Sequence, residues 1–211
     1  MPILLLIRHG ENDYVKTSKL AGHLPGIHLN QRGQKQAEAL GEALKDVPIK
    51  AVYSSPLERA METAAPIAKP HKLEIIPESD LMDTNVGSWQ GKSLKVLRRT
   101  KMWGVVQSAP SRFRFPEGES FVESQVRYVN VLERIIKKHN KPQDVIAAVF
   151  HADPIKLVVA YFLGMPLDHF QRLSCDTGSL TALYVGEAGV NLIKLNQRPP
   201  FDFLSKPQKR K

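Results

Sequence analysis

Leu4-Leu5-Leu6-Ile7-Arg8-His9-Gly10-Glu11 joins an apolar run of strand character to an Arg-His pair, and a glycine follows at once. In an open α/β sheet, ligands bind in the crevice at the carboxyl ends of the strands. The pattern therefore predicts a first strand whose end presents His9, a candidate nucleophile, beside the permanent cation Arg8.

Two further apolar runs end in polar residues of the same kinds. Residues 145–150 form a near-continuous apolar strand, as expected at the centre of a parallel sheet, and His151 follows directly. Residues 51–53 precede Ser54-Ser55-Pro56, with Arg59 one turn into the next segment. Three strand ends then supply two histidines and two arginines, a set of donors that suits a phosphoryl group.

Strand-like and helix-like segments alternate along the chain, which predicts repeated βα units. The expected fold is a three-layer α/β/α sandwich whose sheet is mostly parallel, with an antiparallel edge from two final strands around a hairpin-like turn. The expected strands are residues 3–7, 51–53, 73–76, 145–150, 180–185 and 191–195, and the main helices are residues 31–45, 56–68, 119–138 and 154–163. In the third helix the expected buried face carries Phe121, Val122, Val126, Val129, Leu132 and Ile136.

The domain organisation follows from composition. We expect a single domain over residues 1–204, because the apolar content of 42% in 211 residues can support one sizeable core. Residues 77–120 are rich in Pro, Gly, Ser and Arg, and we interpret them as a lid-like insertion that covers the site. Residues 205–211 are predicted to form a basic, flexible tail.

Charge and cysteine content restrict the classes of binding partner and the cellular location. The net charge of +9 is compatible with anionic small molecules, nucleic acid or an anionic membrane surface. Nucleic acid is disfavoured because aromatic residues do not alternate with the basic ones, and no apolar run reaches membrane-spanning length. Cys175 is the only cysteine, so no intrachain disulfide forms and a cytoplasmic location is expected.

The candidate residues can be given chemical roles. His9 can attack phosphorus through a neutral ring nitrogen while a carbonyl near Gly10 holds the other nitrogen. Arg8, Arg59 and His151 can bind the non-bridging oxygens. Asp83 is the candidate that protonates the leaving group and then activates water. The helices after Arg59 and His151 both direct their N-terminal dipoles at the same region.

These motifs, in this order, resemble those of the histidine phosphatase superfamily, also called the phosphoglycerate mutase-like family, over nearly the whole chain. The signature matches are residues 8–11, 29–37, 54–64, 87–91, 115–120 and His151. The resemblance implies a phosphoglycerate mutase-like fold, a phosphohistidine at His9, and phosphate binding by Arg8, Arg59, His151 and Ala152. It implies neither a metal ion nor an organic cofactor. Arg114, in the expected lid, is a candidate for gripping a second anionic group.

The sequence departs from the family pattern at several positions. The family commonly has threonine in place of Asn12 and asparagine in place of Val15, where a phosphate contact is expected. Its usual acid is glutamate, one methylene longer than Asp83, which leaves three roles open for Asp83: the acid, a weaker donor of shorter reach, or a bystander. Ala152 replaces a usual glycine.

Three functions remain open at this point. The favoured one is a phosphomonoester hydrolase acting on a small phosphorylated metabolite. The first alternative is a phosphomutase of the phosphoglycerate mutase type, although cofactor-dependent mutases are expected to be longer than this chain. The second is a weakened scaffold that binds a phospholigand as a regulatory module. Histidines 9 and 151 as metal ligands are disfavoured because no third ligand stands at metal spacing. Nothing in the sequence decides between a monomer and a homodimer.

Overall fold

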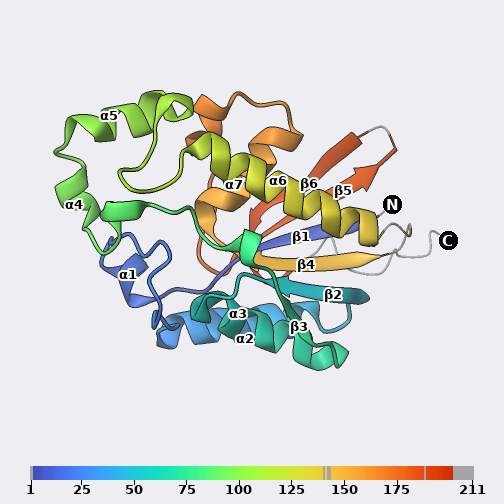
Figure 1. Ribbon diagram of the computed structural model, residues 1–211. Coiled ribbons are helices and arrows are strands. Elements are labelled where there is room, and N and C mark those ends of the chain that lie inside the picture. The colour runs from blue at the N-terminus through green and yellow to red at the C-terminus, as the bar shows by residue number, and fades with distance from the viewer. Residues whose placement is uncertain (1, 140, 142–143, 188, 202–211) are drawn as a thin grey trace.

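The computed structural model describes residues 2–139, 141, 144–187 and 189–201. It shows the predicted α/β sandwich, with one six-stranded sheet between two layers of helices (Figure 1). The strand order is β3-β2-β4-β1-β5-β6. The strands are β1 (Ile3–Arg8), β2 (Ile49–Ser54), β3 (Ile75–Pro77), β4 (Val145–Phe150), β5 (Leu180–Gly186) and β6 (Gly189–Gln197).

The sheet register brings the predicted strand ends together. β1 runs parallel to β4, with Ile3 opposite Val145 and Arg8 opposite Phe150. β2 also runs parallel to β4 on its other side, with Ser54 opposite Val149. β5 and β6 form the expected antiparallel edge beyond β1. The residues that follow β1, β2 and β4 therefore emerge at one edge of the sheet.

Helices α2 and α3 cover one face of the sheet and α6 and α7 cover the other (Figure 1). The short helices α1, α4 and α5 lie beyond the carboxyl ends of the parallel strands (Figure 1). The α-helices are α1 (Asp13–Lys16), α2 (Gln31–Leu44), α3 (Glu58–Ala68), α4 (Leu94–Leu97), α5 (Lys101–Ser108), α6 (Phe121–Lys138) and α7 (Ala152–Phe162). Short 3-10 helices span Lys69–His71, Ser79–Leu81, Gly87–Trp89, Pro110–Arg112 and Leu167–Arg172.

Local capping explains where the main helices begin. The Asn30 side chain accepts a hydrogen bond from the Gly33 amide at the start of α2. α6 begins after Ser120, which forms a reciprocal capping box with Glu123. α3 begins at Glu58, not at Pro56 as predicted, because Leu57 still has an extended backbone with ψ of 138°.

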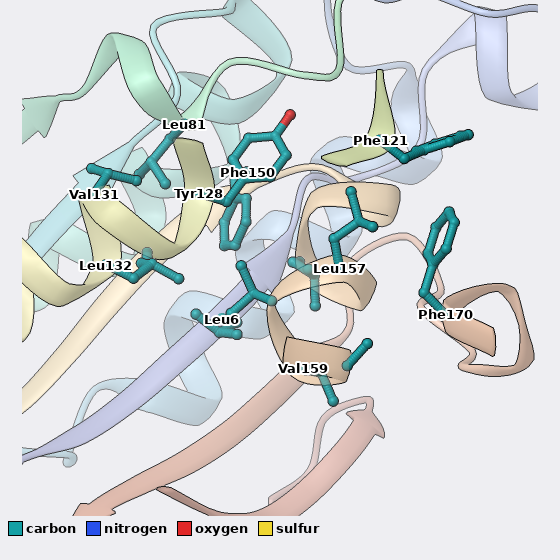
Figure 2. Packing of buried hydrophobic residues seen from close by; sticks show 14 of the residues in the cluster. Leu6, Leu81, Phe121, Tyr128, Val131, Leu132, Phe150, Leu157, Val159 and Phe170 are labelled. Atoms are coloured by element: carbon teal, nitrogen blue, oxygen red, sulfur yellow. The ribbon is translucent and has the colours of Figure 1, made fainter. Parts of the chain in front are cut away.

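Apolar side chains pack against both faces of the sheet. Figure 2 shows part of the larger cluster, in which Leu6 of β1 and Phe150 of β4 lie beneath side chains of α6 and α7. The predicted face of α6 is wrong in part, since Val122 and Val126 are exposed by 43% and 54%. Tyr128, Val131 and Ile135 are buried instead, because the stripe that meets the sheet is rotated around the helix.

Residues 77–120, which were expected to be an insertion and are called the inserted segment below, contain more regular structure than their composition predicted. α4 and α5 lie within it, and the 3-10 helices Ser79–Leu81 and Gly87–Trp89 bracket Asp83. Within the described ranges, no helix combines the length and the apolar character needed to cross a bilayer. The predicted basic tail, residues 205–211, lies outside the described residues.

Candidate active site

His9 emerges at the end of β1 and is only 4% exposed. Its Nδ1 lies 2.7 Å from the carbonyl oxygen of Gly10, the contact that the sequence predicted. A carbonyl oxygen can only accept, so Nδ1 carries the proton and Nε2 keeps its lone pair. The Gly10 amide in turn donates to Thr63 Oγ1 at 3.0 Å, which fixes this turn against α3.

Arg59 and His151 reach the same place from α3 and from the end of β4. The Arg59 side chain is fully buried, and its Nη2 donates to the Gly22 carbonyl at 2.7 Å. The imidazole rings of His9 and His151 lie edge to face with centroids 5.2 Å apart. Arg8 directs Nη1 to the carbonyl of Cys175 at 2.6 Å. The structure thus brings together Arg8, His9, Arg59 and His151, which we call the anion cradle.

Asp83 approaches the cradle from the inserted segment. Its Oδ2 lies 3.6 Å from Arg59 Nη2 and 3.7 Å from His151 Nδ1, while Oδ1 accepts a hydrogen bond from the Thr84 amide at 2.9 Å. The Asp83 side chain is 24% exposed, whereas the side chains of Arg59 and His151 are 0% and 1% exposed. One carboxylate oxygen therefore faces both the cradle and the solvent-accessible cavity.

The four cradle residues and Asp83 line one cavity of about 280 Å³. Four buried nitrogens of the cradle have no hydrogen-bond partner within the described residues: Arg8 Nε, Arg59 Nε, Arg59 Nη1 and His151 Nδ1. Leaving a buried polar group unpaired costs about 1–3 kcal/mol. A tetrahedral oxyanion would supply acceptors to such nitrogens, so their arrangement is what an anion site requires.

Burial controls the charge of both histidines. It lowers the pKa of His9 well below the usual value, and the nearby guanidinium groups of Arg59 and Arg8 lower it further. Burial also lowers the pKa of His151, again helped by Arg59. Both rings are therefore neutral at pH 7, which leaves His9 Nε2 available as a nucleophile.

Asp83 shifts in the opposite direction. Burial raises the pKa of its carboxyl group above the usual value, although the positive charge of Arg59 opposes this and Asp153 reinforces it. A raised pKa increases the fraction of protonated carboxyl near neutral pH, as a proton donor requires.

The other predicted site residues differ in where they lie. Ala152 lines the cavity at the first residue of α7, where the helix N-terminus faces the cradle. Arg114 is not among the described lining residues, because its guanidinium pairs with Glu123 and donates to the Gly118 carbonyl at 3.1 Å. No group of three histidine, cysteine or acidic side chains in the described ranges is arranged to hold a metal ion.

Several residues that contact the site were given no role from the sequence. Ser55 Oγ lies 3.0 Å from His151 Nε2. Asn12 is fully buried, lines the cavity and accepts from the Val15 amide, while its Nδ2 has no partner within the described residues. His23 donates from Nε2 to the Asp83 carbonyl at 2.6 Å. Ser55 stands directly before the proline of one recognised motif, and Asn12 directly follows another, so both carried a signal that could have indicated their place.

A sequence profile of the histidine phosphatase superfamily (branch 1) matches residues 4–198. The chain belongs to this superfamily. The resemblance inferred from the motifs is thereby confirmed, and so is the phosphoglycerate mutase-like fold.

Relatives within the superfamily carry two kinds of activity in their names. The chain is 29% identical to phosphoserine phosphatase 1 of Hydrogenobacter thermophilus, over 92% of this chain and 91% of that protein. It is 26% identical to a 2,3-bisphosphoglycerate-dependent phosphoglycerate mutase of Thermoplasma acidophilum, over 88% of each chain. The α-ribazole phosphatase of Shigella flexneri superposes with a TM-score of 0.82 at 26% identity, over 93% of this chain and 96% of that one.

The match to the Thermoplasma mutase corrects one expectation. A mutase in this superfamily can be as short as the present chain, because the alignment covers 88% of both proteins. Chain length therefore does not separate hydrolysis from phosphoryl transfer between hydroxyl groups.

Proposed function

We propose that the protein is a phosphomonoester hydrolase that acts through a phosphohistidine at His9 on a small phosphorylated metabolite. The observation that carries the proposal is the set of unpartnered cradle nitrogens beside the neutral His9 ring. These donors face the cavity that Asp83 also lines, so one pocket holds a nucleophile, anion donors and an acid.

The reaction divides into two steps. In the first, His9 Nε2 forms a bond to phosphorus as the ester P–O bond breaks, and protonated Asp83 gives its proton to the departing alkoxide. In the second, the Asp83 carboxylate takes a proton from water as the water oxygen attacks phosphorus and the P–N bond breaks. Inorganic phosphate leaves, and Asp83 is again protonated.

The cradle stabilises charge in both steps. Arg8 and Arg59 present planar guanidinium groups to the equatorial oxygens of the transferring phosphoryl group. His151 contributes its Nδ1, and the N-terminus of α7 adds a favourable dipole. These donors are in place before substrate binds, so little reorganisation is needed during the reaction.

The walls of the cavity favour hydrolysis over mutase activity. A mutase acting on phosphoglycerate must also hold a carboxylate. Beyond the cradle, the described lining offers Lys19 as its further cation, against the two carboxyl groups of Asp83 and Asp153. The rest of this lining mixes apolar side chains with the uncharged polar side chains of Asn12, Ser18 and Thr84. Arg114, the candidate for a second anionic group, is engaged with Glu123.

Parallel assays test the proposal. Purified protein is incubated with a panel of phosphorylated metabolites for phosphate release, and with 3-phosphoglycerate plus 2,3-bisphosphoglycerate for isomerisation. We expect phosphate release without isomerisation, and a phosphorylated protein that the His9→Ala variant does not form. Isomerisation faster than phosphate release would establish the mutase instead, and binding without turnover would establish a regulatory module.

A further inference from the structure

We propose that Arg127 of α6 is a positioning residue for Asp83, because it clamps the backbone that carries this carboxyl group. The inference rests on the proposed role of Asp83 as acid and base. Arg127 does not belong to the cavity lining in the described part of the chain, so it acts through the backbone and does not touch substrate.

The Arg127 guanidinium binds three backbone carbonyls at and just before Asp83. Its Nη1 donates to the carbonyl oxygens of Asp80 at 2.8 Å and Met82 at 3.0 Å. Its Nη2 donates to the carbonyl oxygen of Asp83 itself at 3.2 Å. A planar guanidinium with fixed donor directions can hold such a turn in one orientation, whereas an ammonium group cannot reproduce the fork.

Two neighbours hold the guanidinium in place. The Glu119 carboxylate accepts from Arg127 Nη2 at 2.6 Å and from the Asn85 amide at 2.7 Å, so it connects Arg127 to the backbone just after Asp83. The Tyr128 hydroxyl accepts from Nη2 at 3.0 Å and donates to the Met82 carbonyl at 3.0 Å. Figure 2 shows the Tyr128 ring among the core side chains, with its hydroxyl directed away from Leu6 and Leu132.

Asp83 depends on this backbone support. Its Oδ1 accepts from the adjacent Thr84 amide, and its Oδ2 stands 3.6 Å from Arg59 and 3.7 Å from His151. Side-chain contacts with the cradle are therefore too long to fix the carboxyl group alone. An acid must lie within hydrogen-bond reach of the leaving oxygen, and a displacement of about 1 Å can cost about a hundredfold in rate.

The test compares two substrates that differ in their need for an acid. An alkyl phosphate loses a strongly basic alkoxide and needs the Asp83 proton, whereas p-nitrophenyl phosphate loses a stable phenolate and does not. The ratio of kcat/KM for the two substrates is measured for wild type, Arg127→Met, Arg127→Lys, Tyr128→Phe and Asp83→Asn. Arg134→Met is the matched control, because Arg134 lies on the same helix and binds Asp80 through its exposed side chain.

We expect Arg127→Met to lower kcat/KM for the alkyl phosphate by about 10- to 100-fold and that for p-nitrophenyl phosphate by less than about threefold. Tyr128→Phe and Arg127→Lys should lower kcat/KM by smaller factors, again mainly for the alkyl phosphate, and Arg134→Met should not lower it for either substrate. Thermal melting of each variant separates misfolding from misplacement, and Arg127→Lys keeps the test informative if Arg127→Met does not fold.

The outcomes separate the two proposals. Equal losses for both substrates, or no loss in either Arg127 variant while Asp83→Asn is selective, would overturn the positioning role and leave Asp83 as the acid. If Asp83→Asn itself showed no selectivity, the proposed acid would be wrong, and the positioning role would fall with it.

Discussion

The anion cradle and the inserted segment meet in one cavity, yet they are built in different ways. Arg8 ends β1, and His9 and His151 directly follow β1 and β4. Arg59 lies in the first turn of the helix after β2, so the register of three neighbouring parallel strands places the cradle. Asp83 lies between two short 3-10 helices, and its backbone is held by side chains of α6 and by His23. Regular backbone structure positions the cradle, and a set of side chain to backbone contacts positions Asp83.

Because of this difference, substitutions in the two regions should affect the turnover of different substrates in different ways. A change in the cradle should affect every substrate, because in the proposed reaction the cradle stabilises the phosphoryl group that all substrates share. The effect of a change in the inserted segment should depend on the leaving group, because in the proposed reaction Asp83 protonates that group. Val86 and Leu94 line the same cavity.

The largest effect should come from His9→Ala. Loss of the nucleophile removes the covalent route, so we expect kcat to fall by at least about 10⁴-fold for every substrate. Intact-protein mass spectrometry after rapid acid quench should show the phosphorylated form in wild type and none in the variant. Thermal melting checks that the variant folds, and substantial turnover by folded His9→Ala would remove the covalent mechanism.

A comparison of Arg59→Met with Asp83→Asn should give smaller effects and distinguish the cradle from the inserted segment. Arg59→Met removes buried donors from the phosphoryl group, so kcat/KM should fall by about 10²- to 10³-fold for alkyl and nitrophenyl esters alike. Asp83→Asn should lower kcat/KM by about 10²-fold or more for alkyl esters only. If both variants responded equally to the leaving group, the proposed division of roles would be wrong.

The sequence predicted the cradle because its residues sit at positions that a periodic pattern can locate. The strand Val145–Phe150 was predicted residue for residue, since six consecutive apolar residues are buried on both faces of a sheet. His9 and His151 then followed from the ends of their strands. The contact of His9 with the Gly10 carbonyl was also predictable, because it is local to a single turn.

The inserted segment was harder to predict because its contacts join positions distant in sequence. Arg127 reaches residues more than 40 positions earlier, and His23 reaches Asp83 across 60 positions. No local pattern indicates such pairs. The face of α6 was partly misjudged for a related reason, since Tyr128 with its polar hydroxyl is buried while the apolar Val126 is exposed.

Lowering the pH should reduce the free energy of unfolding of the protein through the two cradle histidines. The pKa of His9 and that of His151 lie well below 6.5 in the folded protein, so the unfolded chain binds these protons first as the pH falls. The free energy of unfolding should therefore decrease below about pH 6.5, by at most about 1.4 kcal/mol per pH unit for each histidine. Urea unfolding between pH 7.5 and 5 measures this slope.

Asp83 should affect the pH dependence of the free energy of unfolding with the opposite sign. Its pKa is raised in the folded protein, so its contribution to stability is greatest at low pH and is lost as the pH rises through the folded value. Asp83→Asn should therefore steepen the loss of stability in acid, and His151→Gln should flatten it. Identical slopes in all three proteins would show that neither region controls the acid response.

The smallest effect should come from Ser55→Ala, which removes the hydroxyl 3.0 Å from His151 Nε2. The Leu57 amide already donates to this oxygen at 3.4 Å, so the hydroxyl hydrogen is free to donate to Nε2 and to hold the proton of His151 on Nδ1, facing the phosphoryl group. Loss of one such hydrogen bond is worth about 0.5–1.5 kcal/mol, or about 2- to 13-fold in kcat/KM. Because the effect passes through a cradle residue, it should be equal for alkyl and nitrophenyl esters, and Ser55→Thr should restore part of it. A loss confined to alkyl esters would instead place His151 on the leaving-group side, with Asp83.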